Sequence, residues 1–208
     1  MMKENLNQLL WQPSQQQIST TNLANFANET GQPNDYKMLH RWSIENKEAF
    51  WHAVWVQCGI VGNMGSERIL IDSGKLPGAQ FFPDARLNFA ENLLKHHGDE
   101  PAVISRFENG ERHTLTRDEL LANVHTLSDK FRDFNLTSGD RVAAYMPNIG
   151  ETVVTMLSTT TLGAVFTSCS PDFGANGVID RFSQTTPRVL VAATGYQYNG
   201  KFISTLKT

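Results

Sequence analysis

The segment from residue 138 to residue 174 constrains the fold more than any other part of the chain. An apolar run at residues 142–146 stops at Pro147, as expected of a buried strand. Apolar residues then recur at helical spacing between residues 151 and 162, and a second β-type run occupies residues 164–168. This order predicts a strand, a crossover helix and a parallel strand. Ligands bind where the strands of such units end, so the loops of this segment are the first candidates for a site.

Strands and helices continue to alternate on both sides of this unit. A hairpin is expected at residues 102–115, because an Asn-Gly pair provides a strong turn signal there. Thr116 and Glu119 form a capping box at the start of a long helix. Further on, the pattern predicts a helix at residues 177–184 and a strand at residues 188–193. Alternation of this kind builds an α/β fold around a parallel sheet with right-handed crossovers.

The first third of the chain differs, since no β-type alternation precedes Arg68. Helices are therefore expected there, the first capped by Thr20 or Thr21 and a later one by Ser43. The aromatic stripe around Trp51 is more typical of a docking face than of a cofactor site, because aromatic rings bury large areas. We expect this helical part to pack on the domain that follows it.

The histidines and cysteines do not indicate a metal site. A short helix is expected at residues 87–94, with Asp84 or a neighbour as its cap, and the adjacent histidines after it are typical of a solvated helix end. The other histidines show no ligand spacing. Cys58 and Cys169 are too far apart in sequence for a zinc pattern and form no disulfide framework, which fits a reducing cytoplasm.

The composition argues against two classes of partner. The chain has 18 basic and 21 acidic side chains and a formal charge of -3, so it offers no broad cationic face to nucleic acid or to an anionic membrane. No apolar stretch approaches the roughly 20 residues of a membrane helix, and the N-terminus lacks the basic start and apolar core of a signal peptide. We therefore expect a cytoplasmic protein with neither nucleic acid nor membrane as a partner.

Residues 195–201 match the spacing of a phosphate-binding P-loop and follow an expected strand. The match fails at Phe202, which stands where a Ser or Thr would hold magnesium, and two tyrosines fill the loop. Two interpretations stay open. Either Lys201 supplies a charge and Tyr196 or Tyr198 a flat face to a nucleotide, or the segment is a solvated surface loop. No nucleophile–base pair occurs, so no catalytic residue is expected.

Several short motifs, spread over nearly the whole chain, carry a resemblance to one family. They are Trp11-Gln-Pro13, residues 36–43 with Phe50-Trp51, Phe81-Phe-Pro83, residues 87–93, residues 139–142, Pro147-Asn148, Gly163-Ala164, residues 168–174 and residues 180–182. On these motifs the chain resembles the acyl-CoA synthetases that form an acyl-adenylate. The run Ser-Cys-Ser-Pro-Asp-Phe-Gly at residues 168–174 is most similar to the branch that activates acetoacetate, because acetyl-CoA synthetases have paired glycines before the phenylalanine.

The resemblance implies a fold and a reaction. The fold is a helical N-terminal extension of the acetyl-CoA synthetase type, residues 1–97, packed on an incomplete α/β AMP-binding subdomain with a partial parallel sheet, residues 98–208. The reaction is a two-step ligation, in which ATP and Mg²⁺ convert acetoacetate to an adenylate and CoA then displaces AMP. The family's phosphate loop, acyl pocket and catalytic lysine lie downstream of the part that this chain matches. The chain is therefore expected to be an inactive front portion that alone binds none of these cofactors firmly; the alternative is a noncatalytic CoA- or nucleotide-binding module, or a structural one.

The resemblance also implies where a ligand would touch this chain. In relatives, the loops after two successive strands contact the nucleotide end of CoA, and the corresponding residues here are Ser170, Pro171, Asp172, Phe173, Tyr198 and Lys201. Acetyl-type relatives carry arginines at the last two positions, so stacking by Tyr198 and one charge from Lys201 would have to suffice. Asp172 would repel phosphate. No metal ligand is implied in this chain.

Overall fold

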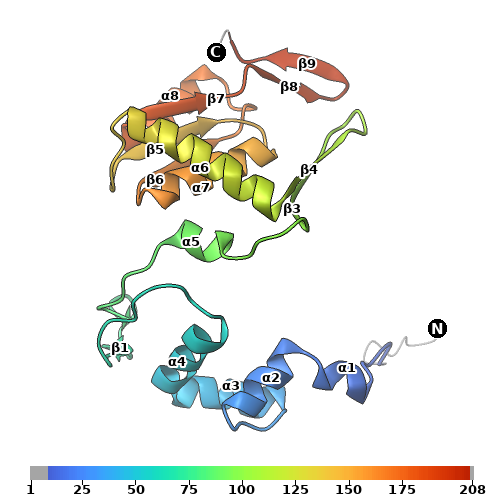
Figure 1. Cartoon of the computed structure of the whole chain (residues 1–208), viewed down its shortest axis with the longest axis vertical. Helices are drawn as coiled ribbons and strands as arrows, with labels where there is room; N and C mark the ends of the chain where they lie inside the picture. The colour runs from blue at the N-terminus through green and yellow to red at the C-terminus, as the bar shows by residue number, and fades with distance from the viewer. Residues whose placement is uncertain (1–8, 207–208) are drawn as a thin grey trace, which may run out of the picture. The chain divides into compact units, whose positions relative to one another are not determined.

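The computed structural model describes residues 9–206 and divides the chain into two compact units, residues 1–86 and residues 87–208 (Figure 1). The domain boundary expected at residue 97 stays a prediction. In its described part the first unit contains α1 (Gln15–Ser19), α2 (Asn22–Glu29), α3 (Tyr36–Glu45), α4 (Lys47–Gln57) and the antiparallel strands β1 (Leu70–Ile71) and β2 (Gln80–Phe81).

Short-range hydrogen bonds define the helices of the first unit. The Thr21 side chain accepts a hydrogen bond from a first-turn amide of α2, which confirms one of the two expected caps. Asp35 caps α3 in the same way. The expectation that Ser43 caps a helix is wrong, because α3 has already begun at Asp35 and the Ser43 hydroxyl donates to the His40 carbonyl oxygen inside it at 2.7 Å. Helix α3 instead ends at Asn46, and α4 begins directly after it.

The aromatic stripe packs within the first unit. Ring contacts join side chains of α2, α3 and α4 to one another and to β2, and they involve Phe26, Trp42, Phe50, Trp51 and Phe81. Trp55 contacts the ring of Phe82, with centroids 4.9 Å apart. These contacts show that the stripe packs within the unit, although Trp51 stays 38% exposed. Its docking on a neighbouring domain stays a prediction.

The second unit contains the parallel sheet. Its elements are α5 (Phe89–Leu94), β3 (Pro101–Arg106), β4 (Arg112–Thr116), α6 (Arg117–Asp133), β5 (Arg141–Tyr145), α7 (Gly150–Thr161), β6 (Val165–Cys169), α8 (Ala175–Thr185), β7 (Val189–Ala192), β8 (Gly195–Tyr198) and β9 (Lys201–Ser204). Strands β3 and β4 form the expected hairpin. Thr116 and Glu119 form the expected capping box at α6.

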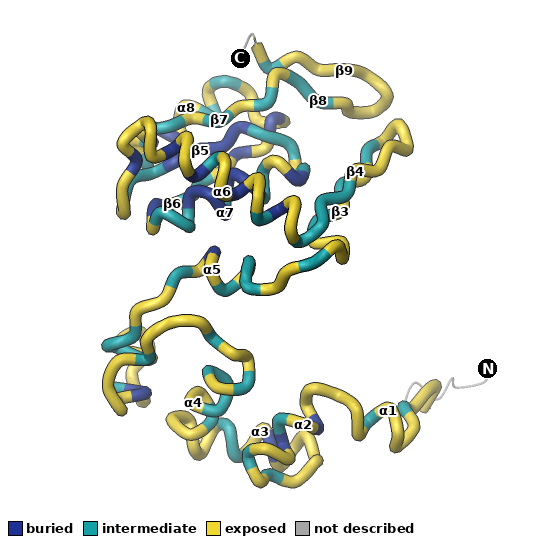
Figure 2. The backbone as a smooth tube through the Cα atoms, in the orientation of Figure 1, coloured by how far each residue is buried: buried dark blue, intermediate teal, exposed yellow. Residues whose placement is uncertain are grey.

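Strand β5 is the centre of a three-stranded parallel sheet with the order β6-β5-β7. Alternate side chains of β5 point to opposite faces. Val142 packs with Phe131 of α6 on one face, and Tyr145 packs with Phe182 of α8 on the other. Helices therefore cover both faces of β5, and the strand is buried along most of its length (Figure 2). The predicted α/β class with a partial parallel sheet is confirmed.

The segment that matches P-loop spacing is a β-hairpin. Strands β8 and β9 pair antiparallel, and Asn199 and Gly200 make the turn with φ values of 51° and 72°. Two consecutive residues with positive φ are typical of the tight turns that join hairpin strands. A P-loop instead leads from a strand into a helix, so this hairpin is not one.

Asp140 stabilises the entry to β5 in a way that depends on pH. Its carboxylate accepts hydrogen bonds from the backbone N–H and the hydroxyl of Thr137, at 2.8 and 2.9 Å, and lies 3.3 Å from Arg188. These interactions, the Thr137 backbone bond first, hold the pKa of Asp140 below its ordinary value.

A lowered folded-state pKa means that Asp140 stabilises the fold above the unfolded pKa of about 3.9 and that this stabilisation disappears as the pH falls through the folded value. Asp140→Asn should therefore lower stability at pH 7 and reduce its dependence on pH below about 4. Urea unfolding at pH 7 and at pH 3 checks this. An unchanged difference between the two pH values would show that other carboxylates dominate the acid response.

Candidate functional site

The ends of β5 and β6 create the position at which a ligand is expected. The two strands end side by side, with Tyr145 opposite Cys169. Strand β5 continues into α7, which packs on α6, whereas β6 continues into α8, which packs on the other face of the sheet through Phe182. Open α/β sheets bind ligands in the crevice between strand ends whose connections diverge in this way. The β6–α8 loop, residues 170–174, lies at this point.

Tyr145 holds the β6–α8 loop from inside the fold. Its hydroxyl lies 3.0 Å from the Pro171 carbonyl oxygen and 3.1 Å from the Phe173 carbonyl oxygen, and it can donate to either. Tyr145 is only 6% exposed, so water competes little for this hydrogen bond. The Ser170 hydroxyl donates to Asp172 Oδ2 at 2.9 Å. The four site residues predicted in this loop therefore form one local cluster.

An aromatic ring of this loop lies against a positive charge of α8. The Arg181 guanidinium lies 4.0 Å from the centroid of the Phe173 ring, a cation–π distance. Helix α8 begins after Gly174 without a side-chain hydrogen bond at its cap. The partial positive charge of the helix start therefore lies beside the loop. A flat group could stack here, whereas an anionic group would meet the Asp172 carboxylate as well as these positive charges.

The other two predicted residues lie on the β8–β9 hairpin. Tyr198 and Lys201 face each other across the strands next to the turn, and both are exposed. The Gly200 amide donates to Glu108 Oε2 at 3.2 Å, which brings the hairpin turn next to the β3–β4 hairpin (Figure 1). The Glu108 carboxylate therefore lies at the turn next to Lys201 in sequence, and a negative charge there lowers the positive potential that the turn offers a phosphate.

Tyr196 connects the hairpin to the β6–α8 loop. Burial disfavours the phenolate of Tyr196, and the nearby Asp172 carboxylate adds to this effect, so the pKa of Tyr196 is raised. The Asp172 carboxylate itself accepts the hydrogen bond from Ser170. Tyr196 thus brings the β8–β9 hairpin close to the β6–α8 loop.

A groove of about 380 Å³ lies beside Tyr196. It lies between the two hairpins and the β5–α7 loop, and its lining residues are Arg106, Phe107, Glu108, Asn109, Glu111, Pro147, Asn148, Ile149, Gly195, Tyr196, Gln197 and Phe202. The charged residues of this lining are one arginine, Arg106, and two glutamates, Glu108 and Glu111, so the groove carries no net positive charge. It extends the candidate site along the same end of the sheet.

Sequence reasoning missed Tyr145 and Arg181 as parts of the site. A signal for Tyr145 was present, because a tyrosine that ends a buried strand has to place its hydroxyl on a polar partner. Arg181 gave no comparable signal, since only the fold brings its guanidinium over Phe173.

Neither a metal centre nor a membrane span is found in the part of the chain that the structure describes. Residues 9–206 contain no group of three or more His, Cys, Asp or Glu side chains placed to bind a metal ion. The helices among these residues are also too short or too polar to cross a bilayer. The geometry instead offers an aromatic ring, a guanidinium and a helix start at a strand end.

Comparison with protein families identifies the class of protein. A family model described as "AMP-binding enzyme" matches residues 89–206, more than half of the chain. A second model, described as "Acetyl-coenzyme A synthetase N-terminus", matches residues 36–93. The chain therefore belongs to the AMP-binding enzyme family.

Within this family the chain is similar to acetoacetyl-CoA synthetases, which confirms the resemblance predicted from the motifs. It is 44% identical to the acetoacetyl-coenzyme A synthetase of Rhizobium meliloti over 197 residues, which are 92% of this chain and 30% of that protein. The acetoacetyl-CoA synthetase of Xenopus tropicalis is 36% identical over 201 residues, again 30% of its length. The solved acetoacetyl-CoA synthetase from Streptomyces lividans superposes with a TM-score of 0.86 at 41% identity, covering 95% of this chain and 32% of that one. The chain thus spans about 30% of the length of these relatives.

Removing the Tyr145 hydroxyl should loosen the β6–α8 loop. Tyr145→Phe keeps the ring in the core but leaves the Pro171 and Phe173 carbonyl oxygens without this donor. We expect a loss of about 1 kcal/mol in the free energy of unfolding and faster amide hydrogen exchange in the loop. Tyr198→Phe is the matched control, because the Tyr198 side chain is exposed and the same change should cost less than about 0.5 kcal/mol. Equal effects of the two changes would contradict the role given to Tyr145.

Proposed function

We propose that this chain is the N-terminal part of an ATP-dependent ligase that joins acetoacetate to CoA. The observation that carries the proposal is the 44% identity to an acetoacetyl-coenzyme A synthetase over 92% of the chain. The loop at the diverging ends of β5 and β6 supports it, because that is where a family member of this topology would receive a nucleotide. The match to an N-terminal family model supports the placement within the longer enzyme.

The proposed reaction has two steps. A carboxylate oxygen of acetoacetate attacks the α-phosphorus of ATP, and the bond to pyrophosphate breaks. The CoA sulfur then attacks the carbonyl carbon of the adenylate, the bond to the AMP oxygen breaks, and the thiol proton is released. Mg²⁺ bound to ATP would neutralise phosphate charge in the first step. We assign neither a Mg²⁺ ligand nor a catalytic residue to this chain, and we place the enzyme in the cytoplasm.

In this proposal the chain supplies part of the CoA site. Phe173, stacked under Arg181, offers a flat face, and Tyr198 with Lys201 offers a second ring and a charge at the hairpin. The β6–α8 loop that carries Phe173 is shaped by Ser170, Pro171 and Asp172. Because most of the relatives' length lies outside this chain, we expect weak CoA binding by the chain alone.

The test compares the chain alone with the chain joined to the rest of the Rhizobium meliloti synthetase, the part beyond the region that the two share. Pyrophosphate release is measured with ATP, Mg²⁺, CoA and either acetoacetate or acetate. We expect release only from the joined protein, and more of it with acetoacetate. A silent joined protein beside an active Rhizobium meliloti enzyme would contradict the ligase proposal and favour a noncatalytic CoA-binding module, which direct CoA binding by the chain would then establish.

The charge of Lys201 provides a sharper test of the CoA site. In the joined protein, Lys201→Ala should raise the KM for CoA about tenfold, since a hydrogen bond to a charged group contributes about 1.5–3 kcal/mol. The KM values for ATP and acetoacetate should not change. Lys130→Ala is the control, because Lys130 is an exposed lysine on α6 that pairs with Asp133. Equal KM values for CoA in the two variants would show that Lys201 does not contribute to CoA binding.

A further inference from the structure

Phe173 is an exposed aromatic residue whose ring and backbone are both held in place. The residue is 41% exposed, yet the Arg181 guanidinium lies 4.0 Å from the centroid of its ring. Its backbone N–H donates to the Ser170 carbonyl oxygen at 3.2 Å. Its own carbonyl oxygen lies 3.1 Å from the Tyr145 hydroxyl, which can donate to it. A ring that is already fixed in this way loses little freedom when a flat group stacks on it, so the β6–α8 loop presents a preorganised stacking surface.

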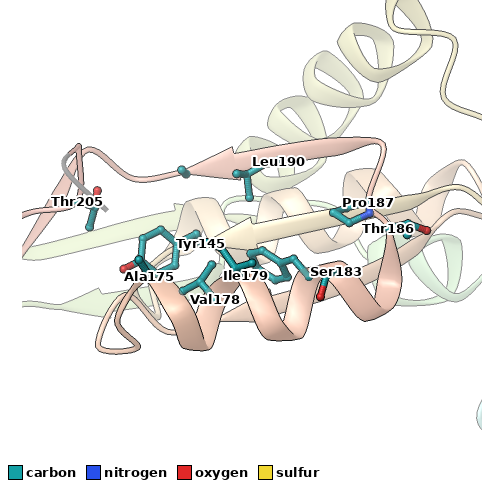
Figure 3. A pocket seen from close by; sticks show the side chains of 11 residues that line it. Tyr145, Ala175, Val178, Ile179, Ser183, Thr186, Pro187, Leu190 and Thr205 are labelled. Atoms are coloured by element: carbon teal, nitrogen blue, oxygen red, sulfur yellow. The ribbon is translucent and has the colours of Figure 1, made fainter.

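Tyr145 anchors this surface from inside the fold. An apolar groove between α8 and β7 is lined by Tyr145, Ile179 and Leu190 among other residues (Figure 3). The Tyr145 ring packs in one buried cluster with Phe182 of α8, and Val178 lies against this cluster. Because Tyr145 also ends the central strand β5, the sheet and α8 together fix the position of its hydroxyl. The loop is therefore tied to the rigid part of the unit through the Tyr145 side chain.

We propose that Tyr145 is a positioning residue for CoA, which holds Phe173 where the adenine ring of CoA stacks. The inference rests on the proposed function, which places Phe173 in the CoA site. Tyr145 is only 6% exposed and its hydroxyl is directed at loop carbonyl oxygens, so it acts through Phe173 and not by contact with the ligand. Stacking on an aromatic ring contributes strongly to the binding of a base, and a displaced ring should therefore weaken CoA binding.

The test measures the steady-state kinetics of the joined protein with Tyr145→Phe, which keeps the ring in the core and removes the hydroxyl. We expect the KM for CoA to rise about fivefold, because CoA then has to order the loop as it binds. The kcat at saturating CoA and the KM values for ATP and acetoacetate should change by less than about twofold, the pattern of an interaction that serves binding alone. An unchanged KM for CoA overturns the proposal.

Ser128→Ala separates loop placement from general stability. The buried Ser128 hydroxyl on α6 also donates to a carbonyl oxygen, that of Ser158 at 3.3 Å, so its removal takes away the same kind of hydrogen bond outside the β6–α8 loop. This variant should keep the KM for CoA within about twofold of the value for the unsubstituted joined protein. An equal rise in both variants would show that the KM follows stability, and it would overturn the role of Tyr145.

Phe173→Ala tests whether Tyr145 acts through the Phe173 ring. Removing the ring should itself raise the KM for CoA. Adding Tyr145→Phe to this variant should change the KM by less than about twofold more, because two residues that serve one contact have non-additive effects. Fully additive effects of the two substitutions overturn the proposed route.

Equilibrium binding distinguishes this inference from the proposed function. Calorimetric titration of CoA in the presence of AMP and acetoacetate needs no turnover, since no ATP is present. A joined protein that is silent but binds CoA, and binds it more weakly with Tyr145→Phe, counts against the ligase function alone. An active joined protein whose CoA affinity does not respond to Tyr145→Phe counts against the positioning role alone. No CoA binding by the unsubstituted joined protein overturns both.

Discussion

Phe131→Ala is expected to lower the free energy of unfolding of the second unit by about 3–5 kcal/mol, the usual loss for a large aromatic side chain removed from a core. Phe131 is 2% exposed and packs with Leu136, Val142 and Ala164 between α6 and the sheet. The cavity left by alanine would lie directly on the central strand, where neighbouring elements cannot easily close it.

The measurement needs a probe of the second unit. All four tryptophans precede residue 56, so their fluorescence reports on the first unit and urea unfolding is better followed by far-ultraviolet circular dichroism. Phe134→Ala is the matched control, because this phenylalanine ends the same helix but is 63% exposed. We expect a change within about 0.5 kcal/mol for the control. Similar losses for the two variants would contradict the assignment of Phe131 to the core.

Asn88→Ala should cost about 2–3 kcal/mol, from one lost helix cap and two lost hydrogen bonds. The Asn88 side-chain oxygen accepts from the Glu91 amide at 3.1 Å and so caps α5. Its nitrogen donates to the carbonyl oxygens of Thr160 and Thr161, at 3.0 and 3.1 Å, and so satisfies the end of α7. One side chain therefore fastens α5 to α7.

Asn88→Asp separates these two roles. A carboxylate can still cap α5, but it has no N–H group to donate to α7 and would repel the carbonyl oxygens there. We expect Asn88→Asp to be nearly as unstable as Asn88→Ala in urea unfolding. A variant as stable as the original chain would show that the cap alone matters and that the bonds to α7 contribute little.

The elements that the sequence predicted well depend on short stretches of chain. The capping box of Thr116 and Glu119 joins residues three positions apart, and the hairpin turn at residues 109–110 needs only an Asn-Gly pair. The strand and helix limits of β5, α7 and β6 followed from apolar spacing and from Pro147. Ser43 shows where this reasoning fails: an acceptable cap residue was present, but a better start existed upstream at Asp35.

The candidate site was predictable only in part. The β6–α8 loop could be located from the sequence, because ligand sites of βαβ units lie where a strand ends, and the end of this strand was predictable. The sequence alone could not show that Tyr196 lies near Asp172, because that depends on where the β8–β9 hairpin lies beside the loop. The cap of α5, expected from Asp84 or a neighbour, is Asn88, while Asp84 accepts hydrogen bonds from Arg68.

The sequence by itself determined the α/β class, the starts of α2 and α6, the β3–β4 hairpin turn and the family resemblance, since these depend on side-chain periodicity and on hydrogen bonds between near neighbours. Only the tertiary structure decided which distant groups meet: Asn88 with the end of α7, Tyr145 with the β6–α8 loop, and Ile179 with Leu190 across an open groove. The physical reason is that such contacts depend on how complete elements pack, and no short window of sequence contains both partners.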